Sequence, residues 1–136
     1  MVSGYPDGSF RPDSPVTRAE FAAMVNNAYK FVDSSAVTFG DVKSDQWFAQ
    51  TIAQAVHAGY LGGYPNNTVK PLAPISRQEA ASVLFKLKTL DADPSAVAKF
   101  ADYSKFPEWS KGAVGSVVKI GIIGGYPDNT FRPFNP

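Results

Sequence analysis

Two arginines stand at positions where an isolated helix would not favour a cation. Arg18 and Arg77 each come directly after a hydroxyl residue and two residues before a glutamate, which is the spacing of a helix-capping box. A cation in the first turn faces the positive end of the helix dipole. Two explanations are open. In the first, the guanidinium and the free helix N–H groups together bind an anion such as a carboxylate. In the second, the arginine forms a structural ion pair, for instance with Asp41, Asp102 or an aspartate of a loop.

A glycine-rich loop motif recurs three times, about 60 residues apart. It begins at Gly4, Gly63 and Gly125 and reads Gly-Tyr-Pro, then Asp-Gly, Asn-Asn or Asp-Asn. These are turn sequences, because proline presets φ and Gly or Asn tolerates positive φ. A period of this length with a turn at its centre indicates an array of small supersecondary units. The apolar residue after each turn predicts a loop pinned to a core: Phe10, Val69 and Phe131.

Several loop residues have both a structural and a ligand-binding explanation. A glycine is needed either because the backbone adopts a special conformation or because a ligand approaches the bare N–H groups. The double glycines favour the close approach of a ligand. We expect each tyrosine ring to pack on the core and its hydroxyl to be available to a ligand. We interpret Asp7 and Asp128 as residues that form Asx turns; a contact with the ligand is the less favoured explanation. The candidate binding residues of the loops are Gly62, Gly63, Tyr64, Gly124, Gly125, Tyr126 and Asp128.

Other recurring side chains are weaker candidates. Trp47 and Trp109 each open a second kind of helix above an apolar face, so we expect them to anchor the core; exposure at a ligand groove is the alternative. Asp41 and Asp102 are interpreted as turn residues that precede these helices. The remaining loop cations are Arg11, Lys70 and Arg132. We interpret them as ordinary solvated side chains; the alternative is an electrostatic rim that attracts an anionic polymer.

Catalytic and metal chemistry have no matching residues. His57 is the single histidine, lies in mid-helix, and has neither a cysteine nor a recurring serine partner. The Asp-Gly loops lack the run of carboxylates that an EF-hand requires, and the glycine loops do not match a P-loop. We therefore predict that the chain is not an enzyme and binds no metal or cofactor.

Two kinds of amphipathic helix must position the loops. The first kind follows the capping boxes at Thr17 and Ser76, and the second follows a Phe-x-Asp motif and ends at Gly59 or Gly121, which suit left-handed C′ positions. Apolar residues recur at helical spacing in all four segments: Phe21, Met24, Val25, Ala28 and Phe31; Ile52, Ala55, Val56 and Tyr60; Ala80, Val83, Leu84, Leu87 and Leu90; Val114, Val117, Val118 and Ile122.

The composition is that of an ordered globular domain. The 136 residues are 44% hydrophobic and 18% charged, enough to bury a core. The net charge of +1 without a basic cluster argues against nucleic acid or an anionic membrane as partner. The aromatic content of 13% suits a core or a sugar-binding surface. No transmembrane run or signal peptide is recognisable, so we expect any export signal to lie on a longer parent chain.

These motifs together resemble the S-layer homology family. Its repeat contains an F-x-D start, a Trp, a G-Y-x-D-G-x-F-x-P loop and an I/V-T-R-A-E helix start. Residues 16–20 match the last motif fully, whereas residues 75–79 have Ser for Thr and Gln for Ala. The central loop departs further, with Asn66-Asn67 for Asp-Gly and Val69-Lys70 for Phe-Arg. The resemblance covers nearly the whole chain, except for linkers.

The resemblance implies a mainly α, pseudo-threefold helical repeat bundle whose helix pairs are joined by Gly-Tyr-Pro loops. Family members anchor surface-layer proteins and exoenzymes non-covalently to secondary cell-wall polysaccharide, often through pyruvylated N-acetylmannosamine. By this resemblance Arg18 and Arg77 contact the pyruvyl carboxylate, and the chain is extracellular, at the cell wall of a bacterium, without enzymatic activity. The alternative is a structural or assembly module that mediates protein–protein contacts between repeats.

The repeat frame predicts one domain over residues 1–136. Residues 1–38 form the C-terminal part of one repeat, 39–90 a complete repeat, and 91–136 the N-terminal part of a further one. A threefold arrangement would leave the two Arg helices without a third partner, and an apolar face of that size is seldom left to water. We therefore expect homo-oligomers in which protomers complement one another; closure of four helices into a compact bundle is the alternative.

Overall fold

The computed structural model describes residues 15–136, and in this part of the chain it is mainly helical. Four α-helices and two short 3-10 helices are present, with an isolated bridge between Thr17 and Pro74 and no strand in the described residues. The mainly α prediction is confirmed, while the pseudo-threefold arrangement stays a prediction. None of the helices in residues 15–136 has the length and apolar character needed to cross a bilayer.

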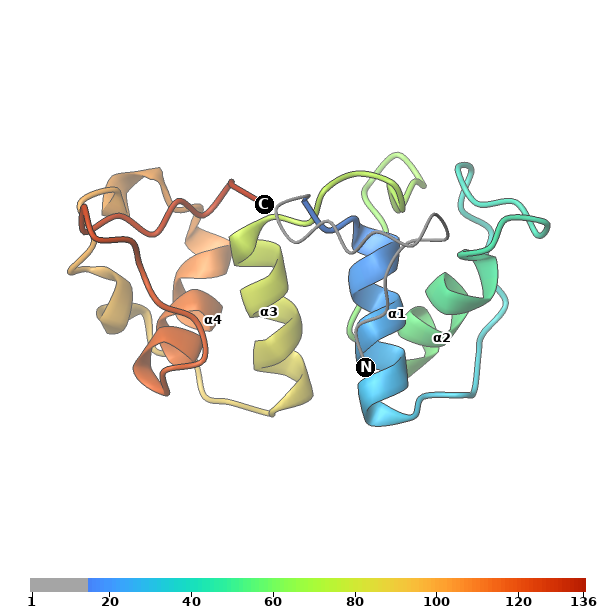
Figure 1. Cartoon of the computed structure of the whole chain (residues 1–136), viewed down its shortest axis with the longest axis horizontal. Coiled ribbons are helices and arrows are strands. Elements are labelled where there is room, and N and C mark those ends of the chain that lie inside the picture. Colours follow the sequence, from blue (N-terminus) through green and yellow to red (C-terminus); the bar gives the residue numbers. More distant parts are fainter. Residues whose placement is uncertain (1–14) are drawn as a thin grey trace, which may run out of the picture. The chain divides into compact units, whose positions relative to one another are not determined.

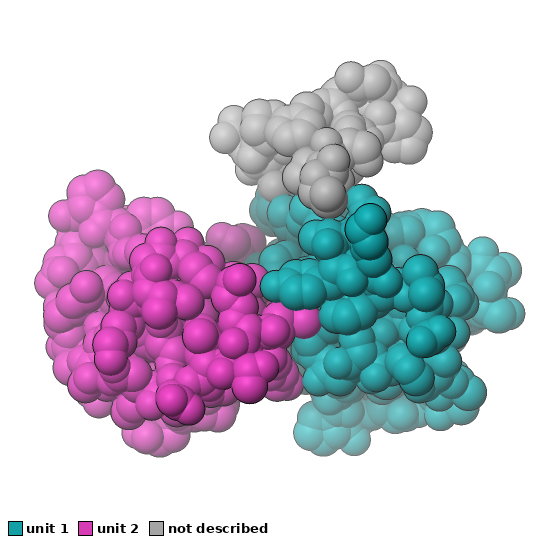
Figure 2. Space-filling model, turned by 90° about the horizontal axis from the view of Figure 1, so that it is seen from below, with its two compact units in different colours: residues 1–75 teal, residues 76–136 magenta. Residues whose placement is uncertain are grey.

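The chain divides into two compact units, residues 1–75 and 76–136, coloured separately in Figure 2. Each described unit combines an Arg helix with the Trp helix and the Gly-Tyr-Pro loop that come after it (Figure 1). These units begin and end at other residues than the predicted sequence repeats. The reason is that each loop binds back to the N-terminus of its own unit's Arg helix, as when Ala19 N donates to Pro71 O at 2.8 Å.

Unit 1 contains α1 (Arg18–Tyr29) and α2 (Ala49–Ala58). The predicted capping box is present, because Thr17 Oγ1 accepts from Glu20 N at 3.1 Å and Glu20 Oε1 accepts from Thr17 N at 3.0 Å. Gly59 ends α2 in the predicted left-handed conformation, with φ of 86°. Both ends of the helical hairpin therefore follow from local sequence.

The face of α1 that packs on α2 differs from the predicted stripe. Ala19, Ala22 and Val25 are buried, whereas Phe21 and Met24 are only partly buried. Alanines at these positions let the two helices approach closely, which shifts the contact face by about one residue around the helix. Of the predicted apolar positions of α2 and its end, these are buried: Ile52, Ala55 and Tyr60.

A buried hydrogen bond also joins the two helices of unit 1. Tyr60 OH donates to Asn26 Oδ1 at 2.7 Å, and Asn26 Nδ2 donates to Thr51 O and Gln54 Oε1 at 3.0 and 3.2 Å. Burial of the phenol raises the pKa of Tyr60 well above its ordinary value. An open hollow of about 460 Å³ lies beside this network, and Asn26, Thr51 and Gln54 of the network are among the residues that line it.

Unit 2 contains α3 (Arg77–Leu87), η1 (Pro94–Val97), η2 (Tyr103–Lys105) and α4 (Glu108–Lys119). The second capping box is also present, with Ser76 as the cap. The core of the unit combines residues of α3, α4, both connecting segments and the loop: Ala81, Val97, Phe100, Phe106, Val114, Val117 and Phe131.

The loops are pinned to the cores as predicted. Phe131 is fully buried, and its ring centre lies 5.5 Å from that of Phe100 and 5.6 Å from that of Phe106. Val69 occupies the same place in unit 1 and is also fully buried. A large apolar side chain in each core fixes the position of the turn that carries the candidate binding residues.

The segment before η1 lies directly on α4. A Cβ built on Gly115 would stand 1.7 Å from Asp93 O, so this close approach requires glycine. The Asp93 carboxylate accepts from Ser95 Oγ and forms an ion pair with Lys119 Nζ at 3.1 Å. These contacts, with the Ser95 hydroxyl first and Lys119 next, lower the pKa of Asp93.

Candidate ligand-binding site

In unit 1 the arginine of the helix N-terminus contacts the Gly-Tyr-Pro loop. Arg18 Nε donates to Val69 O at 2.9 Å, and the guanidinium carbon lies 5.0 Å from the centre of the Tyr64 ring. The Arg18 side chain is buried, so its charge sits within the fold rather than in bulk water. Helix α1 and the loop thus bring together two of the predicted site residues.

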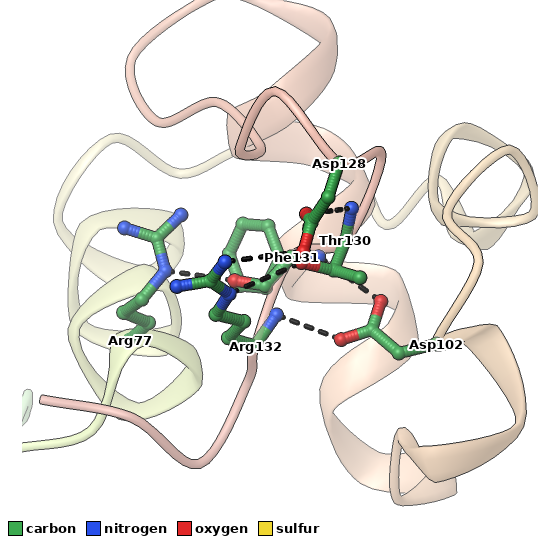
Figure 3. Close-up of polar contacts among 6 residues, drawn as sticks. All are labelled: Arg77, Asp102, Asp128, Thr130, Phe131 and Arg132. Carbon is green, nitrogen blue, oxygen red and sulfur yellow. Dashed lines mark hydrogen bonds and ion pairs between the residues drawn. The ribbon is translucent and has the colours of Figure 1, made fainter.

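Unit 2 repeats this arrangement with Arg77. Its Nε donates to Phe131 O at 2.9 Å (Figure 3), and its Nη2 donates to Gly124 O. The guanidinium carbon lies 4.8 Å from the centre of the Tyr126 ring. The predicted residues Arg77, Gly124 and Tyr126 therefore form one cluster. Such a duplicated geometry is stronger evidence for a site than either cluster alone.

The prediction that free helix N–H groups help to bind an anion is wrong. The main-chain N–H groups of Arg18, Ala19, Arg77 and Gln78 all donate to loop carbonyls at 2.7–3.0 Å. The first N–H groups of a helix have no intrahelical partner, and here the returning loop supplies one. Of the two predicted anion-binding groups, only the guanidinium stays a candidate. The four acceptors are the carbonyls of Ala73, Pro71, Asn135 and Pro133.

The aspartates of the Phe-x-Asp motif hold the loops, which sequence reasoning did not predict. Asp102 is buried, and its Oδ1 and Oδ2 accept from Phe131 N at 3.0 Å and Arg132 N at 2.8 Å (Figure 3). Asp41 makes the same two bonds, to Val69 N and Lys70 N. Both aspartates lie in turns, as predicted, and each carboxylate also holds the main chain of a loop 28 or 29 residues away.

The ion-pair explanation for Arg77 has no support in residues 15–136. No ion pair joins Arg77 to a carboxylate there, since Asp102 is occupied by main-chain N–H groups and Asp128 pairs with Arg132. The neutral carbonyls of Phe131 and Gly124 are the partners of the guanidinium instead. The arginine charge is therefore tethered but not neutralised by them.

The double glycines have separate roles. A Cβ on Gly63 would stand 2.3 Å from the Phe39 ring, and a Cβ on Gly125 would stand 2.5 Å from the Phe100 ring and 2.9 Å from Thr130 O. The second glycine of each pair is therefore required by packing. Gly62 and Gly124 have no neighbour within 4 Å of such a Cβ and do not adopt the left-handed conformation. Their bare main chain is open to an approaching ligand.

The prediction that the tryptophans anchor the core is wrong. Trp47 and Trp109 are each 60% exposed. The neighbouring residues Phe48 and Ser110 are buried instead, because they share a helix face with the core positions that follow. Trp109 lies within α4, so the helix phase turns its indole to the surface, whereas Trp47 lies in the turn that precedes α2. The alternative prediction, in which the tryptophans are exposed and contact a ligand, is therefore still open for both.

Each half-buried tyrosine ring contacts two cations. Besides the helix arginine, Lys70 Nζ lies 4.7 Å from the Tyr64 ring centre, and Arg132 Cζ lies 3.9 Å from that of Tyr126. Cations within about 6 Å of a ring centre are attracted by its electron-rich face. The interpretation of Lys70 and Arg132 as ordinary solvated side chains is therefore too simple.

The Asx turn predicted at Asp128 is confirmed. Asp128 Oδ1 accepts from Thr130 N at 3.0 Å and from the Thr130 hydroxyl, while Oδ2 pairs with Arg132 Nη2 at 3.1 Å (Figure 3). The Thr130 hydroxyl first, and the Arg132 guanidinium next, lower the pKa of Asp128 below its ordinary value. A ligand contact by Asp128 stays a prediction.

Other predictions concern different parts of the chain. His57 Nδ1 lies 2.9 Å from Ser35 Oγ, and the pair is exposed. The equivalent position in unit 2 is Lys119, so this pair does not recur in the second unit. No cluster of three or more potential metal ligands occurs in residues 15–136. The first loop, with its predicted residues, lies outside the described residues: Gly4, Tyr5, Asp7, Phe10 and Arg11.

Comparison with known proteins gives consistent matches. The family model of the S-layer homology domain matches residues 2–22, 38–81 and 99–136. The chain is 36% identical to Cell surface glycoprotein 1 and 33% identical to a cellulosome-anchoring protein, both of Acetivibrio thermocellus, over 98% of its length. It is 31% identical over its whole length to the Surface-layer 125 kDa protein of Lysinibacillus sphaericus. The chain spans 6%, 31% and 12% of these relatives' own lengths.

Proposed function

The chain belongs to the S-layer homology domain family, and on that premise we propose that it anchors a larger protein to the bacterial cell wall by binding a polysaccharide. As a family member it is an extracellular, cell-wall module. The bound unit is an anionic, pyruvylated N-acetylmannosamine, and binding involves no chemical step. Related chains include a protein named as cellulosome-anchoring, which supports an anchoring role.

The observation that carries this proposal is the duplicated cluster of a tethered arginine and a tyrosine ring, which in unit 2 also includes a bare glycine. Arg77, Tyr126 and Gly124 lie together in unit 2, as do the equivalent arginine and tyrosine in unit 1. A guanidinium has five N–H donors, and the two loop carbonyls use only part of that set at Arg77. The remaining donors suit the planar carboxylate of a pyruvyl group.

The neutral part of a sugar fits the other groups of the site. A tyrosine offers a flat apolar face and a hydroxyl, which suit the two kinds of surface on a pyranose ring. Gly62 and Gly124 let the sugar approach the main chain without meeting a side chain. The exposed indoles of Trp47 and Trp109 are proposed as further sugar contacts. The remaining proposed loop contacts are Gly63, Gly125 and Asp128.

Binding to purified polymer tests the proposal. The chain should be retained on pyruvylated cell-wall polysaccharide and should be lost when the same polymer is chemically depyruvylated. Arg77→Ala should reduce retention, whereas Lys86→Ala at the exposed other end of α3 should not. Equal retention on both polymers would contradict recognition of the pyruvyl group.

A second candidate function is protein–protein assembly. Leu72 and Phe134 stand at equivalent loop positions of the two units, and they are 62% and 61% exposed. Large apolar side chains at matched exposed positions favour an interface with another protein or a second copy. Light scattering at micromolar concentration tests self-association. A monomer mass that does not change with concentration would contradict homo-oligomers formed by complementation.

A further inference from the structure

The second cation of each cluster is held in an unusual backbone conformation. Lys70 and Arg132 follow the buried residue of their loops, and they have φ values of 48° and 60°. The left-handed region is unfavourable for a residue with a Cβ, because the Cβ comes too close to the following carbonyl oxygen. The main-chain N–H of each is fixed by the aspartate of the Phe-x-Asp motif, Asp41 or Asp102. The cation is thereby placed at the tyrosine ring rather than left to move with the loop.

The two units differ in what stands beside this cation. In unit 2 Asp128 pairs with Arg132 through Oδ2, at 3.1 Å. In unit 1 the equivalent residue is Asn66, whose Oδ1 accepts from the Thr68 hydroxyl at 2.5 Å. The loops therefore share the contact between the first turn residue and a threonine two positions later. Only the loop of unit 2 carries a carboxylate that neutralises its own cation.

The Lys70 ammonium in unit 1 has no such partner in the part of the chain that the structure describes. Its main-chain N–H bonds to Asp41, but no described carboxylate forms an ion pair with its Nζ. The ammonium lies 4.7 Å from the centre of the Tyr64 ring. An ammonium on a ring keeps its donors for another acceptor, because the ring forms no ordinary hydrogen bond with it.

We propose that the first turn residue of each loop, Asn66 in unit 1 and Asp128 in unit 2, determines how strongly that site selects a negatively charged sugar. With Asn66, the site of unit 1 offers Lys70 to the ligand's carboxylate as a second cation. With Asp128, the second cation of unit 2 is already paired, and the aspartate repels an incoming carboxylate. This inference rests on the proposed function, because it assigns charge selectivity to the same two sites.

The two turn residues differ in charge and hardly in shape. Both turn residues accept a hydrogen bond from the threonine, so exchanging Asp for Asn leaves the fold of the loop supported. Exposed ion pairs at this range contribute up to about 1 kcal/mol, which corresponds to a change of up to about fivefold in affinity. Salt screens such interactions, so the effect should shrink as ionic strength rises.

Site-resolved NMR titration can test the inference on the whole chain. The amide signals of Gly62 and Gly124 report binding to unit 1 and unit 2 separately. The ligands are the methyl glycoside of pyruvylated N-acetylmannosamine and its uncharged pyruvate methyl ester. In the wild-type chain, Gly62 should show a larger preference for the acid over the ester than Gly124 does.

Reciprocal variants then exchange the behaviour of the sites. Asp128→Asn should strengthen binding of the acid at Gly124 by up to about fivefold. It should leave the ester, and both ligands at Gly62, unchanged. Asn66→Asp should weaken binding of the acid at Gly62 by a similar factor. A gain of binding in Asp128→Asn cannot arise from damage to the fold.

Asp93→Asn is the matched control. Asp93 also accepts from a hydroxyl two residues later and also pairs with a cation, but it lies directly before η1 and not on the Gly-Tyr-Pro loop. It removes the same charge from the same unit and should change neither site. If wild-type sites bind the acid but Asp128→Asn has no effect, or Asp93→Asn has the same effect, the inference is overturned. If neither ligand binds the wild-type chain, the result contradicts the proposed function as well as this inference.

Discussion

Arg77 Nε donates to the carbonyl of Phe131, the residue that buries the Gly-Tyr-Pro loop in the core of unit 2, at a distance of 2.9 Å. One side chain therefore connects the start of α3 with a loop 54 residues further along the chain. The same side chain is the proposed partner of the ligand carboxylate. Stability and binding are consequently coupled at this residue, and experiments must measure both.

We expect Arg77→Ala to weaken glycan binding more than it weakens the fold. Loss of a charge-assisted hydrogen bond to the ligand costs roughly 1.5–3 kcal/mol, so affinity at unit 2 should fall by about one to two decades. Loss of the loop tether should lower the free energy of unfolding by about 1–2 kcal/mol. Urea unfolding and titration of the folded fraction separate the two effects. A sharp drop in stability with unchanged affinity would show a purely structural arginine.

The two glycines of one pair should respond differently to alanine. Gly125→Ala should cost about 1–3 kcal/mol of stability, because its Cβ would collide with the Phe100 ring and Thr130 O. Gly124→Ala meets no neighbour and should change stability by less than about 0.5 kcal/mol. If a sugar approaches the main chain there, Gly124→Ala should still reduce affinity. Thermal unfolding and ligand titration of both variants check this, and equal destabilisation would contradict it.

Asp128 should titrate below the ordinary aspartate pKa of about 3.9, chiefly because of the Thr130 hydroxyl. We expect Thr130→Val to raise this pKa further than removal of the Arg132 guanidinium does. A lowered folded-state pKa means that the ionised carboxylate stabilises the loop above the unfolded pKa. That contribution is lost as pH falls through the folded pKa. NMR titration of the Asp128 carboxyl carbon measures the pKa. An unchanged pKa in Thr130→Val would contradict the role of the Thr130 hydroxyl in lowering it.

No more than two ligands should bind per chain. Each proposed site needs an arginine helix and a returning loop, and only Arg18 and Arg77 occupy helix starts of this kind. Isothermal titration calorimetry with the pyruvylated glycoside should therefore give a stoichiometry of two or less. Three equivalent sites per chain would show that a loop binds the sugar without such an arginine.

Local features of the sequence determined the helix ends and the buried loop residues. Thr17 and Ser76 cap helices because the contact with a glutamate three residues later needs only neighbouring residues. Gly59 ends α2 because a residue without Cβ enters the left-handed region at little cost. Phe131 was recognisable as a core residue from its place after a turn. The family was also recognisable, because its motifs are short and recur.

Only the tertiary structure decided which distant residues meet and which helix face is buried. Asp102 and Arg77 are far from the loop in sequence. Nothing in their spacing shows that both side chains hydrogen-bond to the main chain of Phe131. The tryptophans illustrate the second limit. A shift of one residue turns a helix face by about 100°, so the choice between Trp109 and Ser110 as the buried residue depends on how α4 packs against α3. That choice is made by side-chain volumes on both helices together, which no single segment of sequence contains.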